Sequence, residues 1–182
     1  MSLPSETTDR EALLVELVDE QGRATGACPV AEAHTAPGRL HRAFSVLLFD
    51  AAGRVLLQQR AAVKTRFPLQ WANTCCGHPA PGESVVAAAR TRLTEELGIQ
   101  TPVHEVGTFR YRAGDTVTGR VEFEWDHVLI GRFDGEPPQP DPAEVADFAW
   151  VRPEALAAAI EADPQRYTPW LSGVLTLAER SN

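Results

Sequence analysis

Apolar and polar residues alternate along several short stretches of the chain, a pattern typical of β-strands with one buried face. The predicted strands cover residues 13–19, 43–49, 55–59, 103–111, 121–133 and 145–151. Four residues ending in Gly53 join the second strand to the third, which predicts a β-hairpin. A sheet is therefore expected to dominate the fold.

Helical signals are concentrated in three places. Residues 84–97 are the clearest predicted helix, because alanines fill the segment and Gly98 follows it as a helix stop. Pro153 stands at the favoured first position of a second helix, and residues 167–179 predict a third. This order of elements predicts an α+β fold, a mixed β-sheet with helices packed on the sheet.

Two internal segments predict irregular structure. Three prolines interrupt residues 63–81, and four more lie within residues 135–142, which are expected to form a surface connector. Residues 1–10 are polar and are expected to be a disordered leader to a single domain over residues 11–182.

Length and charge exclude several classes of function. The chain has 182 residues, and 17 basic against 25 acidic side chains give a net charge of −8. This balance argues against nucleic acid as a partner, because phosphate-backbone binding needs a basic surface. No apolar run approaches the roughly 20 residues of a membrane span, and no signal-peptide pattern opens the chain. We therefore expect a soluble, cytoplasmic monomer that binds no membrane.

The centre of the chain resembles the Nudix box, in which a glycine is followed by a glutamate and then by a helix ending in Glu-Glu-x-Gly. The matching residues are Gly77, Glu83, Glu95, Glu96 and Gly98. The box usually has an Arg-Glu pair where this chain has Thr91-Arg92. An arginine there would repel the hydrolytic magnesium, which disfavours a diphosphate hydrolase but not a Nudix-like fold. An ordinary acidic helix is the alternative, and it is favoured for Glu95 taken alone.

Histidines and paired carboxylates suggest a metal site. Glu122 and Glu124 stand two apart on a predicted strand, so their side chains share one face, where like charges are costly without a cation between them. His34, His41 and His78 could add imidazole ligands. Taken singly, each histidine is more often structural or solvated, and the glutamates more often a solvent-facing edge. Spacing leaves open whether the five converge.

Several motifs in order carry a resemblance to a known family. They are Ala33-His34-Thr35, the segments 39–45 and 73–79, Glu122-Phe123-Glu124 and Thr168-Pro169-Trp170. Together they closely resemble type 1 isopentenyl diphosphate isomerase, a Nudix-fold family. The similarity runs from about Leu13 to Leu177, nearly the whole chain. The family interconverts isopentenyl and dimethylallyl diphosphate by protonating and deprotonating carbon.

The resemblance implies the catalytic residues. Cys76 and Glu124 match the catalytic pair on opposite faces of the substrate, Tyr111 matches a tyrosine on the glutamate side, and Trp170 matches an aromatic ring that faces the carbocation. Protonating an unactivated alkene requires a desolvated acid, a nearby π-face and the exclusion of water. A buried structural thiol is the alternative for Cys76, and plain core for Trp170.

The resemblance also implies the ligands. The divalent metal, Mg, Mn or Zn, would be held by His34, His41, His78, Glu122 and Glu124. Glu96 matches a carboxylate holding a magnesium ion that bridges to the substrate diphosphate. Arg60, Lys64 and Arg92 fall where the family places basic groups around the diphosphate; Arg60 and Lys64 could instead be surface charges. The expected partner is thus a small prenyl diphosphate.

One position departs from the family. Four residues ahead of His34 the family usually has a lysine that contacts the diphosphate, and here that position is Val30. Losing one charge-assisted contact of ~1.5–3 kcal/mol would weaken binding about tenfold to a hundredfold. Arg23, Arg39 or Arg42 could compensate.

The departure keeps alternatives to the isomerase open. A Nudix-fold prenyl-modifying enzyme, such as a protonation-initiated cyclase, would use the same acid on a different prenyl substrate. A diphosphate hydrolase is opposed by Thr91-Arg92. A non-catalytic prenyl-diphosphate binder is opposed by the presence of the full Cys, Glu, Tyr and Trp set.

Overall fold

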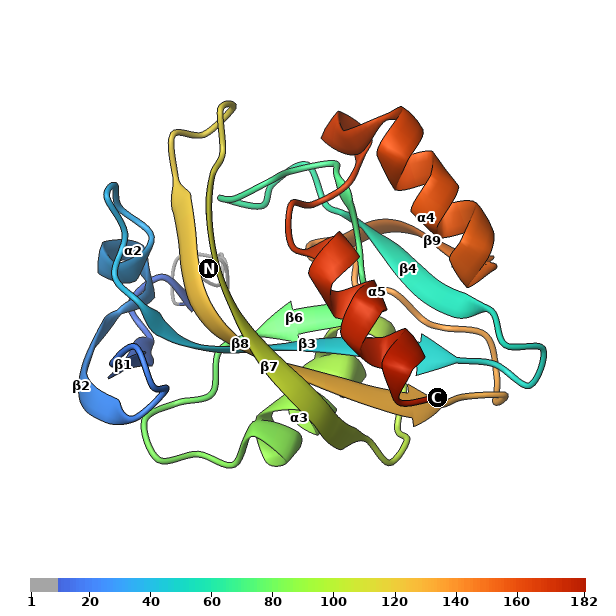
Figure 1. Cartoon of the computed structure of the whole chain (residues 1–182), viewed down its shortest axis with the longest axis horizontal. Coiled ribbons are helices and arrows are strands. Elements are labelled where there is room, and N and C mark those ends of the chain that lie inside the picture. The colour runs from blue at the N-terminus through green and yellow to red at the C-terminus, as the bar shows by residue number, and fades with distance from the viewer. Residues whose placement is uncertain (1–9) are drawn as a thin grey trace, which may run out of the picture.

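The computed structural model describes residues 10–182, so the leader expected at residues 1–10 lies, apart from Arg10, outside the described residues. The strands of the described part are β1 (Leu14–Val18), β2 (Ala24–Pro29), β3 (His41–Phe49), β4 (Val55–Arg60), β5 (Trp71–Ala72), β6 (Cys75–Gly77), β7 (His104–Gly114), β8 (Val121–Arg132) and β9 (Val145–Val151). The helices are α2 (Val30–Ala33), α3 (Val85–Leu97), α4 (Pro153–Ala162), α5 (Leu171–Arg180) and a 3₁₀ turn at Pro164–Arg166. Figure 1 shows this arrangement.

Strand β3 is the hub of the mixed sheet. It pairs in parallel with β8 along its whole length and antiparallel with β1, β4 and β6. Strand β8 continues into an antiparallel pair with β7, and β4 continues into β9 and β5. Every residue of β3 except Arg42 is buried, because helices cover both of its faces. The predicted α+β fold with a mixed β-sheet is thereby confirmed.

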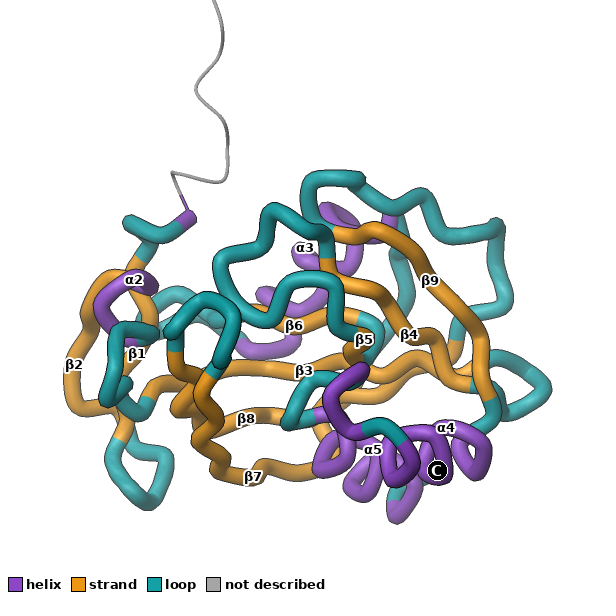
Figure 2. Tube along the Cα trace, turned by 90° about the horizontal axis from the view of Figure 1, so that it is seen from above, coloured by secondary structure: helices purple, strands orange, loops and turns teal. Residues whose placement is uncertain are grey.

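Two apolar cores lie on opposite faces of this sheet. Phe44, Val46 and Leu48 of β3 pack against Leu93 and Leu97 of α3 on one face. On the other face, the alternate residues of β3 pack with the C-terminal helices α4 and α5. Figure 2 shows α3 on one side of the sheet and α4 with α5 on the other. Because side chains alternate between the two faces of β3, successive residues pack into opposite cores.

Local chemistry explains the bounds of α3. The Ser84 hydroxyl accepts a hydrogen bond from the Ala87 amide (3.3 Å), which satisfies one of the unpaired donors of the first turn. Gly98 ends the helix at φ 64°, a left-handed conformation that favours glycine. The predicted helix at 84–97 with its glycine stop is confirmed. Its last turn carries Glu96 inward, where the carboxylate is buried.

The sequence pattern missed the shortest elements. Residues 63–81 are not wholly irregular, because β5 and β6 lie within them, and β6 is fixed by pairing with β3 rather than by its own three residues. Strand β2, helix α2 and the 3₁₀ turn were also not predicted. The last helix begins at Leu171 rather than at residue 167. No helix in residues 10–182 is long and apolar enough to cross a membrane.

A buried carboxylate fastens the β7–β8 turn to the loop after β4. Asp115 accepts hydrogen bonds from the Phe67 amide (2.8 Å), the Val117 amide (3.0 Å) and the Thr118 hydroxyl (2.5 Å). The loop it holds carries Lys64 and neighbouring cations of the cavity described below. Asp115 therefore links the geometry of the sheet to the geometry of the site.

We predict that Asp115→Ala lowers the free energy of unfolding by about 2 kcal/mol at pH 7, because the buried Phe67 amide loses its acceptor. Burial alone would raise the pKa of Asp115, but its hydrogen bonds lower it. The contribution is therefore complete above pH ~4 and shrinks as pH falls through the lowered pKa. Urea unfolding at pH 7 and pH 3 measures both effects. Asp147→Ala, at an exposed carboxylate, is the control; equal costs at the two sites would contradict the assignment.

Candidate functional site

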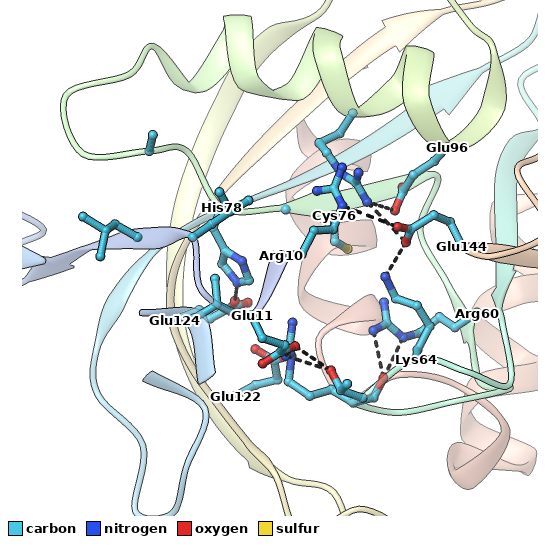
Figure 3. A pocket seen from close by; sticks show the side chains of 18 of the residues that line it. Arg10, Glu11, Arg60, Lys64, Cys76, His78, Glu96, Glu122, Glu124 and Glu144 are labelled. Atoms are coloured by element: carbon cyan, nitrogen blue, oxygen red, sulfur yellow. Dashed lines mark hydrogen bonds and ion pairs between the residues drawn. The ribbon is translucent and has the colours of Figure 1, made fainter. Parts of the chain in front are cut away.

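A cavity of about 380 Å³ opens beside the hub of the sheet. His78 and two carboxylates line one end of it, and basic side chains line the other. Figure 3 shows His78, Glu122 and Glu124 at the first end, Lys64, Glu96 and Glu144 at the second, and Cys76 between them. Its size and mixed lining are those of a small-molecule site.

Strand register gathers the histidine–carboxylate group. In the parallel pair of β3 with β8, His41 lies beside Glu124, and alternation along β8 places Glu122 on the same face. His78 enters from the residue after β6, and His34 ends α2. The five ligand atoms all lie within 4.8 Å of one another. The convergence that sequence spacing could not establish is thus observed.

In two of the histidines, the ring nitrogen Nδ1 lies within hydrogen-bond distance of a backbone carbonyl oxygen. Nδ1 of His34 lies 2.7 Å from the Val30 carbonyl oxygen, and Nδ1 of His41 lies 2.7 Å from the Arg39 carbonyl oxygen. A carbonyl only accepts, so each Nδ1 carries the proton and each Nε2 turns a lone pair toward the carboxylates. This backing is the usual outer support of metal-ligating histidines.

The inward atoms fit a bound cation. Among residues 10–182, Nε2 of His41 is buried without a hydrogen-bond partner and lies 3.2 Å from Oε2 of Glu124. Nε2 of His34 lies 3.0 Å from Oε2 of Glu122, and Nε2 of His78 lies 2.7 Å from Oε2 of Glu124. Lone pairs that face carboxylates at these distances repel unless a proton or a metal ion lies between them. The group can therefore hold a metal ion.

Without a metal, the side chains of this group would take up protons to different degrees. Burial disfavours the charged form of His34, yet Glu122 overcomes it and raises the pKa of His34 to about 9. Burial lowers the pKa of His78 to about 4. The three histidines outweigh burial at Glu124 and hold the pKa of that carboxyl well below its usual range. One buried cation can replace this uneven protonation.

Arg66 holds the outer oxygen of a predicted ligand. Its Nε donates to Oε1 of Glu122 (3.2 Å), which leaves Oε2 to face His34. Its Nη1 donates to Glu11 (3.0 Å), and Thr65 donates to the same carboxylate (2.9 Å). Arg66 thereby fixes the rotation of the Glu122 carboxylate.

The Cys76 thiol lies in a polar cradle at the cavity wall. Sγ donates to Oδ1 of Asn73 (3.2 Å), which also accepts from the indole Nε1 of Trp170 (3.0 Å). On its other side Sγ lies 3.8 Å from the Ser45 hydroxyl, which donates to Asp126 (2.6 Å). Burial, reinforced by Asp126, raises the pKa of Cys76 to about 12. The thiol is therefore neutral at physiological pH.

A cluster of aromatic rings packs around Trp170 beside the cavity. The Tyr111 hydroxyl donates to Oε1 of Glu124, since β7–β8 register places the two residues opposite each other. The Tyr111 and Trp170 ring centroids are 5.8 Å apart, and Phe67 meets Trp170 edge-on at 5.3 Å. Burial, and then Glu124, raise the pKa of Tyr111 well above its usual range, so the phenol keeps its proton. Trp170 is buried yet lines the cavity, so it serves both core and site.

The opposite end of the cavity is a network of ion pairs around Glu144. Lys64 Nζ lies 2.5 Å from the Glu144 carboxylate, and Arg92 Nη2 lies 3.3 Å from it. Arg92 also pairs with Glu96 (2.8 Å), whose other oxygen accepts from Gln58 (3.2 Å). Burial lowers the pKa of Lys64, although Glu96 and Glu144 oppose it. Cations and carboxylates are thus preassembled at this end.

The structure sorts the remaining candidates. Arg60 lines the cavity, but its Nε and Nη2 donate to backbone carbonyls, and its guanidinium carbon lies 5.7 Å from the centre of the Trp170 ring. Glu83 accepts from the Ala80 amide and is exposed. Glu95 lies on the surface and pairs with Arg92, as the ordinary-helix alternative expected. Of the Nudix-box carboxylates, the buried one is Glu96.

The three arginines named as possible replacements for the missing lysine lie away from the cavity. Arg23 pairs with Asp19, Arg39 with Glu32 and Arg42 with Glu16, and none of the three lines the cavity. Val30, the position they were to replace, does line it. Their partners lie close in the fold on the β1–β2 and α2 surface, which draws these guanidinium groups away.

Several site residues were not proposed from the sequence. They are Arg10, Ser45, Arg66, Asn73, Asp126 and Glu144. Asn73 stands within the motif that carries Cys76, and Asp126 continues the alternation of Glu122 and Glu124, so both had a signal. Glu144 follows the proline-rich connector, where no pattern marks it.

Comparisons with known proteins agree with this geometry. Residues 39–171 match the model of the NUDIX domain. The chain is 73% identical over 165 residues to an isopentenyl-diphosphate Delta-isomerase of Nocardia farcinica, covering 91% of this chain and 94% of that protein. It is 46% identical over 156 residues to a protein of the same name from Halorhodospira halophila, covering 86% and 89%. The crystal structure of a Deinococcus radiodurans protein aligns over 93% of this chain and 99% of its own, with a TM-score of 0.71 and 20% identity, which shows the fold alone.

We predict that a divalent metal stabilises the chain through the histidine–carboxylate group. At a free metal concentration about 100 times Kd, binding to the folded state alone adds about 2.7 kcal/mol, a rise in Tm of roughly 5–10 °C. His41→Ala should abolish the rise, and His104→Ala, at an exposed imidazole, should keep it. Scanning calorimetry with Mn²⁺, Zn²⁺ or Mg²⁺ after chelation makes the measurement. An equal rise in both variants would place the metal elsewhere.

We predict that Arg66→Ala weakens metal affinity by about tenfold, the lower end of the range for outer partners of a metal ligand. The cause is the freed rotation of the Glu122 carboxylate. Arg120→Ala is the matched control, since Arg120 donates to the Ala31 carbonyl and not to a ligand. Metal titration by calorimetry measures both affinities. Unchanged affinity in Arg66→Ala would show that Glu122 is held without it.

Proposed function

The chain belongs to the NUDIX family and, within it, to the isopentenyl-diphosphate Delta-isomerases, and we propose that the cavity beside β3 is where its own residues perform that isomerisation. The chain converts isopentenyl diphosphate to dimethylallyl diphosphate. In this reaction the terminal alkene carbon gains a proton, a tertiary cation forms, and the carbon nearer the diphosphate loses a proton. One observation carries the assignment: a neutral thiol and a carboxylate line the same cavity.

Cys76 is one member of the proton-exchanging pair. Asn73 fixes the direction of its S–H bond, because Oδ1 accepts from both the thiol and the Trp170 indole. A raised pKa keeps the thiol protonated and makes its conjugate base strong. Such a group can give a proton to carbon in one direction of the reaction and take one in the other.

Glu124 and Tyr111 form the other member. The Tyr111 hydroxyl donates to Oε1 of Glu124, while the histidines surround Oε2. One oxygen of the carboxylate therefore remains linked to a proton carrier. Protons can pass between Oε1 and the phenol as the substrate carbon is protonated or deprotonated.

The walls suit a short-lived carbocation. Trp170 lines the cavity with the rings of Tyr111 and Phe67 packed against it, and a ring face stabilises a cation within about 6 Å. The same rings exclude water, which would trap the cation as an alcohol. Trp170 is held in place at its indole nitrogen by Asn73, so its orientation does not depend on the substrate.

The histidine–carboxylate group would hold Mg²⁺, Mn²⁺ or Zn²⁺, with His34, His41, His78, Glu122 and Glu124 as ligands. A divalent ion there supplies positive charge that governs which oxygen of Glu124 carries a proton. At the other end, Glu96 would take a Mg²⁺ that accompanies the diphosphate, and Lys64, Arg60 and Arg92 would pair with its oxygens.

The competing functions fit the cavity less well. A hydrolase would need several carboxylates on the Nudix-box helix to hold its metal, whereas α3 has one buried carboxylate, Glu96, and places Arg92 beside it. A mere binder would have no use for a buried thiol oriented by Asn73. A cyclase on another prenyl substrate would share the acid site and differ only in its product. Cytoplasmic location, the monomeric state and a single domain over residues 11–182 remain predictions.

We predict that incubation with isopentenyl diphosphate in D₂O yields dimethylallyl diphosphate that carries deuterium, followed by NMR. Cys76→Ala should lower kcat by about a thousandfold or more, because one proton carrier is lost. Cys28→Ala removes a buried thiol that does not line the cavity and should retain activity. Undiminished turnover in Cys76→Ala would refute the proposed mechanism. Released phosphate would identify a hydrolase, and a substrate left unchanged by metal-loaded protein would favour a different prenyl compound.

A further inference from the structure

The basic end of the cavity receives a cation from the segment that precedes β1. Arg10 lines the cavity, and its Nη2 lies 2.6 Å from Glu95 while its Nε lies 3.6 Å from Glu144. Figure 3 shows it among the residues that surround the Glu144 end. Arg10, Lys64 and Arg92 thus converge on one buried carboxylate.

The backbone around Arg10 is anchored on two sides. The Ala31 amide donates to the Glu11 carbonyl (3.0 Å), and the Val30 amide donates to the Leu13 carbonyl (2.8 Å). On the opposite side the Glu11 carboxylate accepts from Arg66 (3.0 Å). Because these contacts join the segment to α2 and to the loop after β4, they hold the backbone next to Arg10 in a fixed position beside the cavity.

The same contacts place Arg10 next to the position that lacks a basic side chain. Val30 lines the cavity and offers no charge, while the segment hydrogen-bonded to its amide brings in a guanidinium. With 38% of its side chain exposed, Arg10 can turn from Glu95, itself 43% exposed, toward an incoming anion. A guanidinium can offer two parallel donors to phosphate oxygens.

We propose that Arg10 binds the diphosphate of the substrate and supplies the positive charge that Val30 cannot. This inference rests on the proposed function, because the reaction supplies the diphosphate. The three cationic side chains already pair with Glu95, Glu96 and Glu144, and the diphosphate adds several negative oxygens for them to bind. Arg10 determines affinity for the diphosphate and takes no part in proton transfer at carbon.

The test compares Arg10→Gln with Arg23→Gln in the metal-loaded full chain. Arg23 is the matched control, because it pairs with Asp19 on the surface and does not line the cavity. Calorimetric titration with inorganic pyrophosphate and Mg²⁺ should give a Kd about tenfold higher for Arg10→Gln, with Arg23→Gln like the wild type. With isopentenyl diphosphate, KM should rise by a similar factor while kcat stays within about threefold.

Two results would overturn the inference. Arg10→Gln could bind pyrophosphate as tightly as Arg23→Gln, which would make Arg10 a surface ion pair only. It could also lose the metal-induced rise in Tm, which would mark a structural role. Pyrophosphate binding is measured without turnover, so a wild type that binds pyrophosphate but isomerises nothing would refute the proposed function and leave the Arg10 comparison decisive.

Discussion

The site depends on the register of β3 against its two neighbours. Parallel pairing sets His41 beside Glu124, and antiparallel pairing sets Ser45 beside Cys76. A slip of one residue would send each of these side chains to the opposite face. The register is fixed because β3 is buried on both faces between two apolar cores, so any slip would also expose core residues. Packing energy that has nothing to do with catalysis therefore holds the metal ligands and the thiol in place.

A second constraint is charge in a confined space. Buried carboxylates at both ends of the cavity need cations, and the ends meet this need differently. At one end imidazoles turn lone pairs inward and leave the cation to come from solution. At the other, Lys64 and Arg92 are built into the chain around Glu144. A chain of net charge −8 can therefore attract a diphosphate, because its few cavity cations act at short range in a medium of low dielectric constant.

The sequence predicts the residues with a chemical role in the site better than the elements and residues that hold them in position. Long periodic elements such as α3 and β8 were predicted, and β8 alternation placed Glu122 and Glu124 on one face. Strand β6 was missed because three residues have no period, and only pairing with β3 makes them a strand. Arg10 and Glu144 were missed for a related reason, since their roles arise from contacts between segments far apart in the chain. Nearness in sequence to Val30 likewise does not reveal that Arg23, Arg39 and Arg42 each pair with a carboxylate away from the cavity.

The Nudix-box helix shows how the same fold can support a reaction from which water is excluded. Thr91 faces solvent and Arg92 pairs with Glu96, so α3 offers one buried carboxylate beside a cation instead of a cluster of acidic ligands. The group proposed to bind metal lies instead around β3 and β8, at the end of the cavity away from Glu144. Hydrolysis needs a metal that activates water beside the phosphorus atoms, whereas isomerisation needs protons at carbon in a dry pocket. Moving the dense cluster of ligands from helix to sheet puts the charge beside Glu124, the group proposed to exchange a proton with carbon.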